Sequence, residues 1–585
     1  MKKGTEDMQK SESKTNRGIT LIALVITIIV LLILAGVTIA MLTGNNGILT
    51  KVKEAKEKTK QAEQEETYAL ESVLNSINSS APSTDGYNEN KEVNSPKITQ
   101  GMIPVKWNGT NWQVCSQDDN EWYSYKDKKW ANIMLSDGTY KSDTVQVGQV
   151  VTDNELGSMY VWIPRYAYTV DNKKTKMNVT FVKGNTNEGV NGETFTTDES
   201  VDTKTTKLVH PGFNLGGTAL TGIWVAKFEA SGTDKDGNAV GNASSTSKDE
   251  QYHPDETTIA KSLPNKISWR HIQIGECEKR SMDITTTDKD KYGINYASSH
   301  LIKNSEWGAV AYLSYSEYGS VPQINGGGSL VSNSHWYDMY TGQGPKSNGN
   351  ESGYNYDAAH NYNTETGVLA STTGNTTGIY DMNGGAWERV AAYLDNGNGN
   401  LNIYGQSADG KIKYFENGAL KEIYSSLWDK YEVSEEEKNN KIKIDGETTI
   451  ITQGDISNWD KGSEIYQAAR LKLATANYNN MAKHKGIGVN EVNVEGFSFY
   501  APGKATSNNS KPWLYYKTLE QAVAGTNSYY GRAWNSDLVL IGYSAWPFVV
   551  RGGSCGSWVG AGVFYSDIAG GYGSSYYGFR SVLVL

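Results

Sequence analysis

The sequence predicts an α+β protein, with an N-terminal helical part followed by a region rich in short strands and loops. An uncharged apolar run over 19–42 and the Ala/Lys/Glu/Gln-rich stretch after it both favour helix. Beyond residue 100, aromatic and β-branched runs alternate with Gly, Asn and Ser, which is typical of short strands joined by turns. The composition agrees with this division, because the chain holds 61 Gly and 37 Tyr but only 12 Pro.

The length, net charge and cysteine content of the chain exclude some classes of function. The chain has 585 residues, with 55 Lys and Arg against 65 Asp and Glu, so its net charge is −10. This acidic balance argues against nucleic acid as a partner, since phosphate binding needs a basic patch. The cysteines Cys115, Cys277 and Cys555 stand far apart in the sequence. They form no motif typical of a zinc site or a disulfide scaffold, so we expect no metal and no cofactor.

The N-terminus predicts a membrane anchor. A helix over the apolar run 19–42 would span about 36 Å, enough to cross a bilayer. Five basic residues precede the run and none follows it until Lys51, so the positive-inside rule places the N-terminus in the cytoplasm. We therefore expect a transmembrane helix over 19–45 and a single-pass cell-membrane protein with the bulk of the chain extracellular.

The junction at Gly18 and Ile19 resembles the leader of type IV prepilins, in which a short basic peptide ends in Gly before an apolar helix. The resemblance implies a leader over 1–18, cleavage after Gly18, N-methylation of Ile19 and contact with other pilins. Ala23 stands where that family usually carries a Glu that pairs with a neighbouring subunit. Entry into a pilus therefore stays open, beside a simple signal anchor.

The next segments predict a stalk, a linker and a small β-module. Residues 46–78 carry apolar residues at helical spacing among charges, which predicts an amphipathic stalk helix. Residues 79–100 have the Ser, Asn and Pro content of a linker. Within 101–145, tryptophans flank an Asn-Gly turn over 107–112, and aromatics flank a longer loop over 122–130. We expect a small β-hairpin module whose aromatics pack together, with a carbohydrate-binding face as the alternative.

Residues 146–585 predict one large domain. Residues 159–166 and 221–229 are strand candidates, and 305–313 predict a helix with a capping-type start. Polar stretches indicate insertions near 231–258 and near 396–464, the second with a charged helix near 426–441.

Four segments resemble, in family order, motifs of the formylglycine-generating enzyme family, whose fold is a variant of the C-type lectin fold. The resemblance implies a C-type lectin-like domain over 146–585. The segments are Gly222–Glu229, Leu301–Ala311, Asn383–Val390, and Arg551–Cys555 together with Gly578–Val582.

The family's oxidase activity is not expected here. That chemistry uses two neighbouring cysteines as copper ligands in the C-terminal region, where this chain has only Cys555. Another branch uses iron held by clustered histidines. We predict no enzyme activity, because fold does not imply function and the histidines show no HxxxH-type spacing. They are His210, His253, His271, His300, His335, His360 and His484.

The segment 541–585 has an unusual composition. It contains no Lys, Glu, Gln, Asn, Met, His or Thr, while Gly, Ser and Tyr supply 22 of its 45 residues. Tyr, Ser and Gly enrichment is the chemistry of antibody paratopes, where Tyr gives large amphipathic contacts and Ser and Gly give adaptable ones. Short framework-like segments alternate with Tyr/Ser/Gly clusters, so we interpret 541–585 as a variable region. A Gly-rich end to a β-core is the alternative.

This alternation resembles the variable proteins of diversity-generating retroelements, which carry a C-type lectin-like fold with a hypervariable C-terminus. In those systems AAY codons become NNY codons, which encode Tyr, Ser, Gly, Ala, Asp and Ile but never Lys, Glu, Gln, Met or Trp. Trp558 departs from that pattern. The ligand-binding residues that we predict are Tyr543, Ser544, Ser557, Trp558, Val559, Tyr565, Ser566, Asp567, Tyr572, Ser574, Ser575, Tyr576 and Tyr577.

Together these features predict a surface-displayed, membrane-anchored or pilus-associated protein with a non-catalytic, ligand-binding head. The membrane contact would be residues 19–42, and the ligand would lie on another cell, a phage or a host. A formylglycine-generating-type oxidoreductase and a structural minor pilin are the rival functions.

Overall fold

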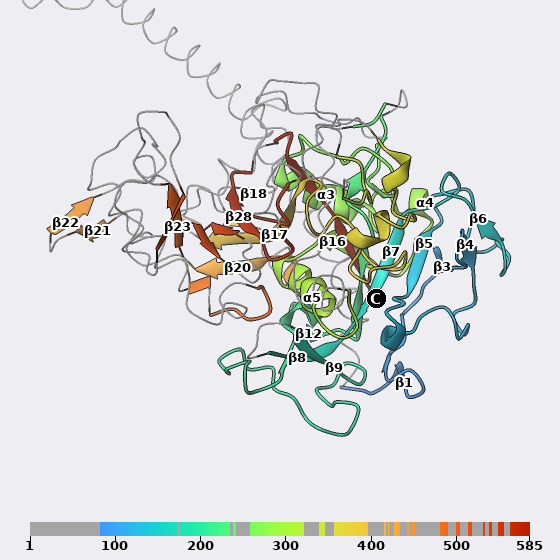
Figure 1. Cartoon of the computed structure of the whole chain (residues 1–585), viewed down its shortest axis with the longest axis horizontal. Helices are drawn as coiled ribbons and strands as arrows, with labels where there is room; N and C mark the ends of the chain where they lie inside the picture. The colour runs from blue at the N-terminus through green and yellow to red at the C-terminus, as the bar shows by residue number, and fades with distance from the viewer. Residues whose placement is uncertain are drawn as a thin grey trace, which may run out of the picture. The chain divides into compact units, whose positions relative to one another are not determined.

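Short strands make up most of the regular structure in the computed structural model of this chain (Figure 1). All residues that the structure describes belong to one unit, residues 73–585. They are 82–171, 176–234, 238–240, 258–320, 339–345, 356–395, 415–416, 419–420, 426–432, 441–444, 447–450, 480–481, 483–488, 499–502, 513–516, 530–532, 538–540, 548–554, 562–571 and 573–585.

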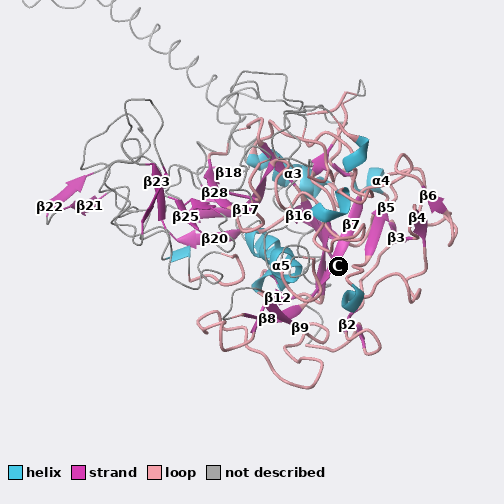
Figure 2. Ribbon diagram, viewed as in Figure 1, coloured by secondary structure: helices cyan, strands magenta, loops and turns pink. Residues whose placement is uncertain are grey.

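The expected fold class and localisation are corrected by the helices that the structure describes. These are α3 (Ile274–Asp283), α4 (Lys289–Tyr292) and α5 (Asn304–Ser314), and the described residues are otherwise sheet-rich (Figure 2). No helix among the described residues is long and apolar enough to cross a bilayer. This finding contradicts the α+β class with an N-terminal transmembrane helix and the single-pass membrane localisation. The leader with Gly18 and Ile19, the helix 19–45 and the stalk 46–78 lie outside the described residues.

One eight-stranded antiparallel sheet forms the centre of the fold, in the order β16-β30-β13-β7-β5-β3-β4-β6. Strands β7, β13 and β30 are buried along their whole length, which explains their nearly continuous apolar sequences. The strand β30 lies between β13 and β16, so the C-terminal residues join the edge strand β16 to the rest of the sheet. The bounds are β3 (Met102–Trp107), β4 (Trp112–Val114), β5 (Asn132–Leu135), β6 (Val150–Val151), β7 (Met159–Pro164), β13 (Gly222–Ala226), β16 (Ser298–Leu301) and β30 (Ser581–Val584).

The expected hairpin at residues 107–112 is confirmed. Trp107 pairs with Trp112 across β3 and β4, and their rings meet edge to face at 5.5 Å. The side chain of Asn108 accepts the backbone N–H groups of Thr110 and Asn111, which closes the turn locally. These strands are part of the central sheet rather than a separate one.

The aromatic residues of 101–145 pack inward. Trp112 and Trp130 are 0% exposed and Trp122 is 2% exposed. Trp122 Nε1 donates to the Asn132 carbonyl at 2.8 Å, and Trp130 Nε1 donates to the Tyr318 carbonyl at 3.0 Å. These rings therefore build the core, in line with packing rather than a carbohydrate-binding face.

A second, mixed sheet holds the C-terminal part of the chain, in the order β20-β17-β27-β28-β26-β25-β23-β24, with β29 pairing to β17. The helix expected near 426–441 is wrong, because Asp429–Glu432 is a strand that pairs in parallel with β17 and buries Tyr431 opposite Leu394. The bounds are β17 (Trp387–Asp395), β20 (Asp429–Glu432), β23 (Phe499–Pro502), β24 (Trp513–Tyr516), β25 (Tyr530–Arg532), β26 (Leu538–Leu540), β27 (Phe548–Arg551), β28 (Ser566–Ala569) and β29 (Tyr577–Phe579).

Smaller elements connect these sheets. A three-stranded sheet has the order β10-β8-β9 and the remaining strands form two-stranded pairs. The bounds are β8 (Tyr166–Val170), β9 (Met177–Phe181) and β10 (Leu208–Val209), and then β1 (Tyr87–Asn88) with β2 (Val93–Asn94), β11 (Asn214–Leu215) with β12 (Thr218–Ala219), β14 (Ala230–Ser231) with β15 (Lys261–Ser262), β18 (Phe415–Glu416) with β19 (Ala419–Leu420), and β21 (Lys441–Ile444) with β22 (Glu447–Ile450).

The helix expected over 305–313 is confirmed as α5. The Glu306 carboxylate accepts the backbone N–H of Lys303 at 2.9 Å, which caps the first turn as expected. Every residue of α5 is buried, and Trp307 donates from Nε1 to the Val563 carbonyl at 2.8 Å. The helix therefore ties the segment after β27 to the core.

Candidate functional site

The predicted ligand-binding residues fall into three groups. One group lies outside the described residues: Tyr543, Ser544, Ser557, Trp558, Val559 and Tyr572. The second group, Tyr565 and Ser566, is buried, and the third is half-buried or exposed: Asp567, Ser574, Ser575, Tyr576 and Tyr577.

The structure corrects the expected positions of Tyr565 and Ser566 at a binding surface. Tyr565 is 5% exposed and its ring meets that of Trp387 edge to face at 4.4 Å. Ser566 is 2% exposed and opens β28, where it pairs with Arg551 of β27. Because β28 lies between β27 and β26, the residues at its start face protein on both sides.

The C-terminal loop is defined here as the described residues 570–571 and 573–577, and it contains the most exposed of the predicted ligand-binding residues that the structure describes. Tyr576 is 49% exposed, whereas Ser574, Ser575 and Tyr577 are half-buried. The framework around the loop faces inward as expected, because Phe548, Phe564 and Phe579 are all 0% exposed.

On one side, the C-terminal loop is held by main-chain hydrogen bonds to the segment that leads into α3. The backbone N–H of His271 donates to the Ser574 carbonyl at 2.9 Å, and that of Ile274 donates to the Gly571 carbonyl at 3.1 Å. Gly573 lies so close to His271 that a Cβ built on it would stand 2.7 Å from the His271 carbonyl oxygen. Both bonds use loop carbonyls, which every residue type provides.

Strand β17 holds the second side of the loop in the same way. The backbone N–H of Trp387 donates to the Tyr576 carbonyl at 2.8 Å, and β29 then continues as a parallel partner of β17. The loop is therefore held to the framework by main-chain carbonyls, and within the loop the Ser574 hydroxyl accepts the backbone N–H of Tyr576 at 3.3 Å.

Two buried arginines complete this support, and the sequence analysis did not identify them. Arg270 Nη1 donates to the Ser575 carbonyl at 3.0 Å, and Arg389 Nη1 donates to the Gly570 carbonyl at 3.1 Å. The Arg389 guanidinium also lies 4.7 Å from the centre of the Tyr577 ring, a cation–π contact. Arg389 stands inside the motif segment 383–390, whereas Arg270 gave no signal because about 300 residues separate it from the loop.

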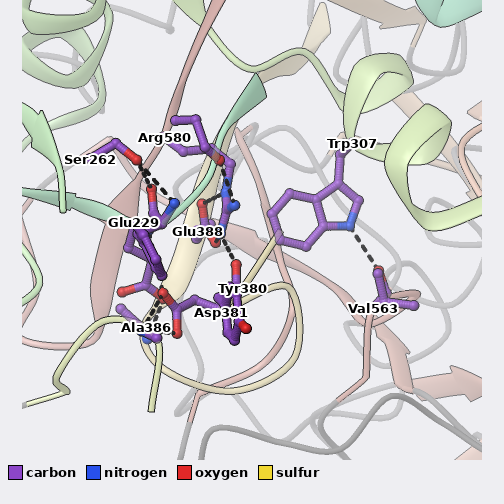
Figure 3. A network of polar contacts seen from close by, with 12 residues as sticks. Glu229, Ser262, Trp307, Tyr380, Asp381, Ala386, Glu388, Val563 and Arg580 are labelled. Atoms are coloured by element: carbon purple, nitrogen blue, oxygen red, sulfur yellow. Dashed lines mark hydrogen bonds and ion pairs between the residues drawn. The ribbon is translucent and has the colours of Figure 1, made fainter. Parts of the chain in front are cut away.

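A buried charge network joins β17 to the start of β30 (Figure 3). The Arg580 guanidinium makes a two-pronged ion pair with Glu388, with Nε donating to Oε2 at 2.6 Å and Nη2 to Oε1. Its other contacts are the carbonyls of Ala226 at 3.1 Å and Tyr380 at 3.0 Å. Arg580 therefore connects β13 and β17 with the start of β30.

Glu229 extends the network from β13 to the segment before β17 (Figure 3). Its Oε1 accepts the backbone N–H of Ala386 at 2.8 Å. Burial raises the pKa of Glu229 well above its ordinary value, and the neighbouring carboxylates of Asp381 and Glu388 raise it further. Burial lowers the pKa of Arg580, but the carboxylates of Glu388, Asp381 and Glu229 together outweigh this effect, so the pKa is raised. The network is buried, and it connects the strands around it rather than exposing a reactive group.

The cysteine thiols that the structure describes are buried. Burial raises the pKa of the Cys115 thiol to about 12, and Cys277 is also a buried free thiol. In the described ranges, no three His, Cys, Asp or Glu side chains stand close enough together to hold a metal ion. Cys555 lies outside the described residues.

Comparison with known proteins adds no relative: neither a known protein family nor a curated protein sequence matches this chain.

Proposed function

We propose that this chain is a non-catalytic ligand-binding protein whose C-terminal loop carries recognition, in the manner of the variable proteins of diversity-generating retroelements. The observation that carries the proposal is how the loop is held. Its contacts to the framework run through the carbonyls of Gly570, Gly571, Ser574, Ser575 and Tyr576, while the Tyr576 side chain is 49% exposed. Such a loop can change its surface chemistry without losing its anchors.

The residue types of the segment support the same proposal. Residues 565–577 consist only of Tyr, Ser, Asp, Ile, Ala and Gly. All six types are encoded by NNY codons, the product of adenine-directed change at AAY codons. Tyr and Ser also supply the contact area and adaptable hydrogen bonds that paratopes use.

The first test is the pattern of natural variation, obtained by sequencing the 3′ end of this gene across related isolates. We expect substitutions to concentrate at Ser574, Ser575 and Tyr576, with Gly573 and Phe579 unchanged. Substitutions spread evenly over the segment, or their absence from the loop, would contradict the proposal.

The second test measures binding directly, using a glycan array probed with the labelled full chain. We expect Tyr576→Ala to lower the affinity for a bound glycan by about 2 kcal/mol, or roughly 30-fold, as for an aromatic at the centre of an interface. Tyr296→Ala is the matched control, because Tyr296 is a tyrosine outside the loop that is 86% exposed. Equal effects of both variants would refute recognition by the loop.

A further inference from the structure

A cavity unrelated to the C-terminal loop lies beside the first turn of α5. Its volume is about 330 Å³, within the size range of pockets that bind small molecules. Its walls come from Arg165 after β7, from His210 before the turn Pro211–Phe213, from β20 and from 484–487. None of the predicted ligand-binding residues lines it.

Arg165 brings a buried positive charge to this cavity. It is 3% exposed, and three of its five N–H donors bond to the carbonyls of Thr186 and Phe213 and to the side-chain oxygen of Asn187, at 3.0–3.1 Å. None of these acceptors is a carboxylate. Burial lowers the pKa of Arg165 to about 10, so it stays protonated at neutral pH.

The carboxylates in the wall are already engaged by the protein. Asp429 accepts the backbone N–H of Ser305 at 2.7 Å and lies 3.3 Å from Lys303 Nζ. Glu199 accepts the backbone N–H of Lys485 at 2.9 Å. Four cationic side chains line the cavity against these two carboxylates, so its wall carries a net positive charge: Arg165, Lys303, Lys430 and Lys485.

The rest of the lining combines uncharged polar groups and aromatic rings with the apolar side chains of Val209, Pro211 and Ile487. Burial lowers the pKa of His210 to about 3, so its ring is neutral. Asn214 and Ser426 contribute amide and hydroxyl groups, and the ring of Tyr431 lies 5.0 Å from that of His484. Hydroxyl and amide groups beside aromatic rings suit a ligand with several hydroxyls, and the net positive charge of the wall suits a ligand that also carries negative charge.

We propose that this cavity binds a small acidic sugar of the hexuronic acid class. The net positive wall with Arg165 and Lys485 would balance the sugar carboxylate, and the amide, hydroxyl and carboxylate groups would bond to the ring hydroxyls. Inorganic phosphate carries negative charge but no sugar ring with hydroxyls, so it would use only part of this lining.

Calorimetric titration of the full chain tests this with D-glucuronate, D-glucose and inorganic phosphate. We expect D-glucuronate to bind at least tenfold more tightly than the other two. Lys485→Gln should weaken D-glucuronate binding at least fivefold. Lys483→Gln should not, because Lys483 lies two residues away, is exposed and does not line the cavity.

Three outcomes would overturn the proposal: no D-glucuronate binding, phosphate binding that is as tight, or an equal effect of the two lysine variants. Tyr576→Ala keeps this test separate from the loop's function, since it should leave the D-glucuronate affinity unchanged. Loss of that affinity in Tyr576→Ala would place the sugar at the loop and refute the cavity assignment.

Discussion

Adding one methyl group at Gly573 should destabilise the protein more than removing the whole side chain of Tyr576. A Cβ at position 573 would stand 2.7 Å from the carbonyl oxygen of His271 and 2.9 Å from its carbonyl carbon. Both atoms belong to the backbone, so the loop would have to move away. That movement strains the bond from His271 N–H to the Ser574 carbonyl, now 2.9 Å long.

The expected loss of stability is the sum of two costs, the overpacking at residue 573 and the loss of the hydrogen bond from His271 N–H. Overpacking of a tight site costs about 1–3 kcal/mol. A lost hydrogen bond adds about 1 kcal/mol, so we expect Gly573→Ala to lower the free energy of unfolding by about 2–4 kcal/mol. Tyr576→Ala and Ser575→Ala remove side chains that the framework does not use, and each should change it by no more than about 0.5 kcal/mol.

Urea unfolding of the full chain, followed by tryptophan fluorescence, measures these differences. The three variants should keep the same slope with denaturant, with only the Gly573→Ala midpoint clearly lowered. If Tyr576→Ala or Ser575→Ala proves as damaging as Gly573→Ala, side chains hold the loop and the reasoning from main-chain anchoring fails.

Three further predictions concern the framework. Phe579→Ala should cost about 3–5 kcal/mol of stability in a thermal melt, because Phe579 is fully buried against Trp269 at 5.9 Å between ring centres; a loss below 1 kcal/mol would contradict this. Glu388→Ala should cost about 3–5 kcal/mol by leaving Arg580 buried without its carboxylate, and urea midpoints near that of the unmodified chain would argue against it. A buried carboxyl with a raised pKa stabilises the fold most below its ordinary pKa, and this contribution is lost as the pH rises. Glu229→Gln should therefore flatten the fall in Tm between pH 5 and pH 8. An unchanged dependence of Tm on pH would show that Glu229 does not titrate as described.

Local features of the fold were predictable where neighbouring residues determine them. The hairpin at 107–112 depends on an Asn-Gly turn, and α5 depends on the acidic cap of Glu306 three residues after Lys303. The helix expected near 426–441 was wrong because its charges also suit a strand, and only pairing with β17 decides between the two.

The exposure of side chains in 541–585 was less predictable, because composition does not reveal which of them face solvent. Tyr565 and Tyr576 belong to similar Tyr/Ser clusters, yet one packs on Trp387 and the other is exposed. The contact of Arg270 with the loop could also not be predicted from the sequence, since its bond to Ser575 joins segments about 300 residues apart.

The place of β30 has a consequence for chains that end early. The strand follows the C-terminal loop in the chain, yet it fills the gap between β13 and β16 in the central sheet. A frameshift or stop codon before residue 581 would remove β30 and leave the facing edges of β13 and β16 unpaired. Such chains would aggregate or be degraded. Folding itself therefore selects for chains that are translated in frame to the end of β30.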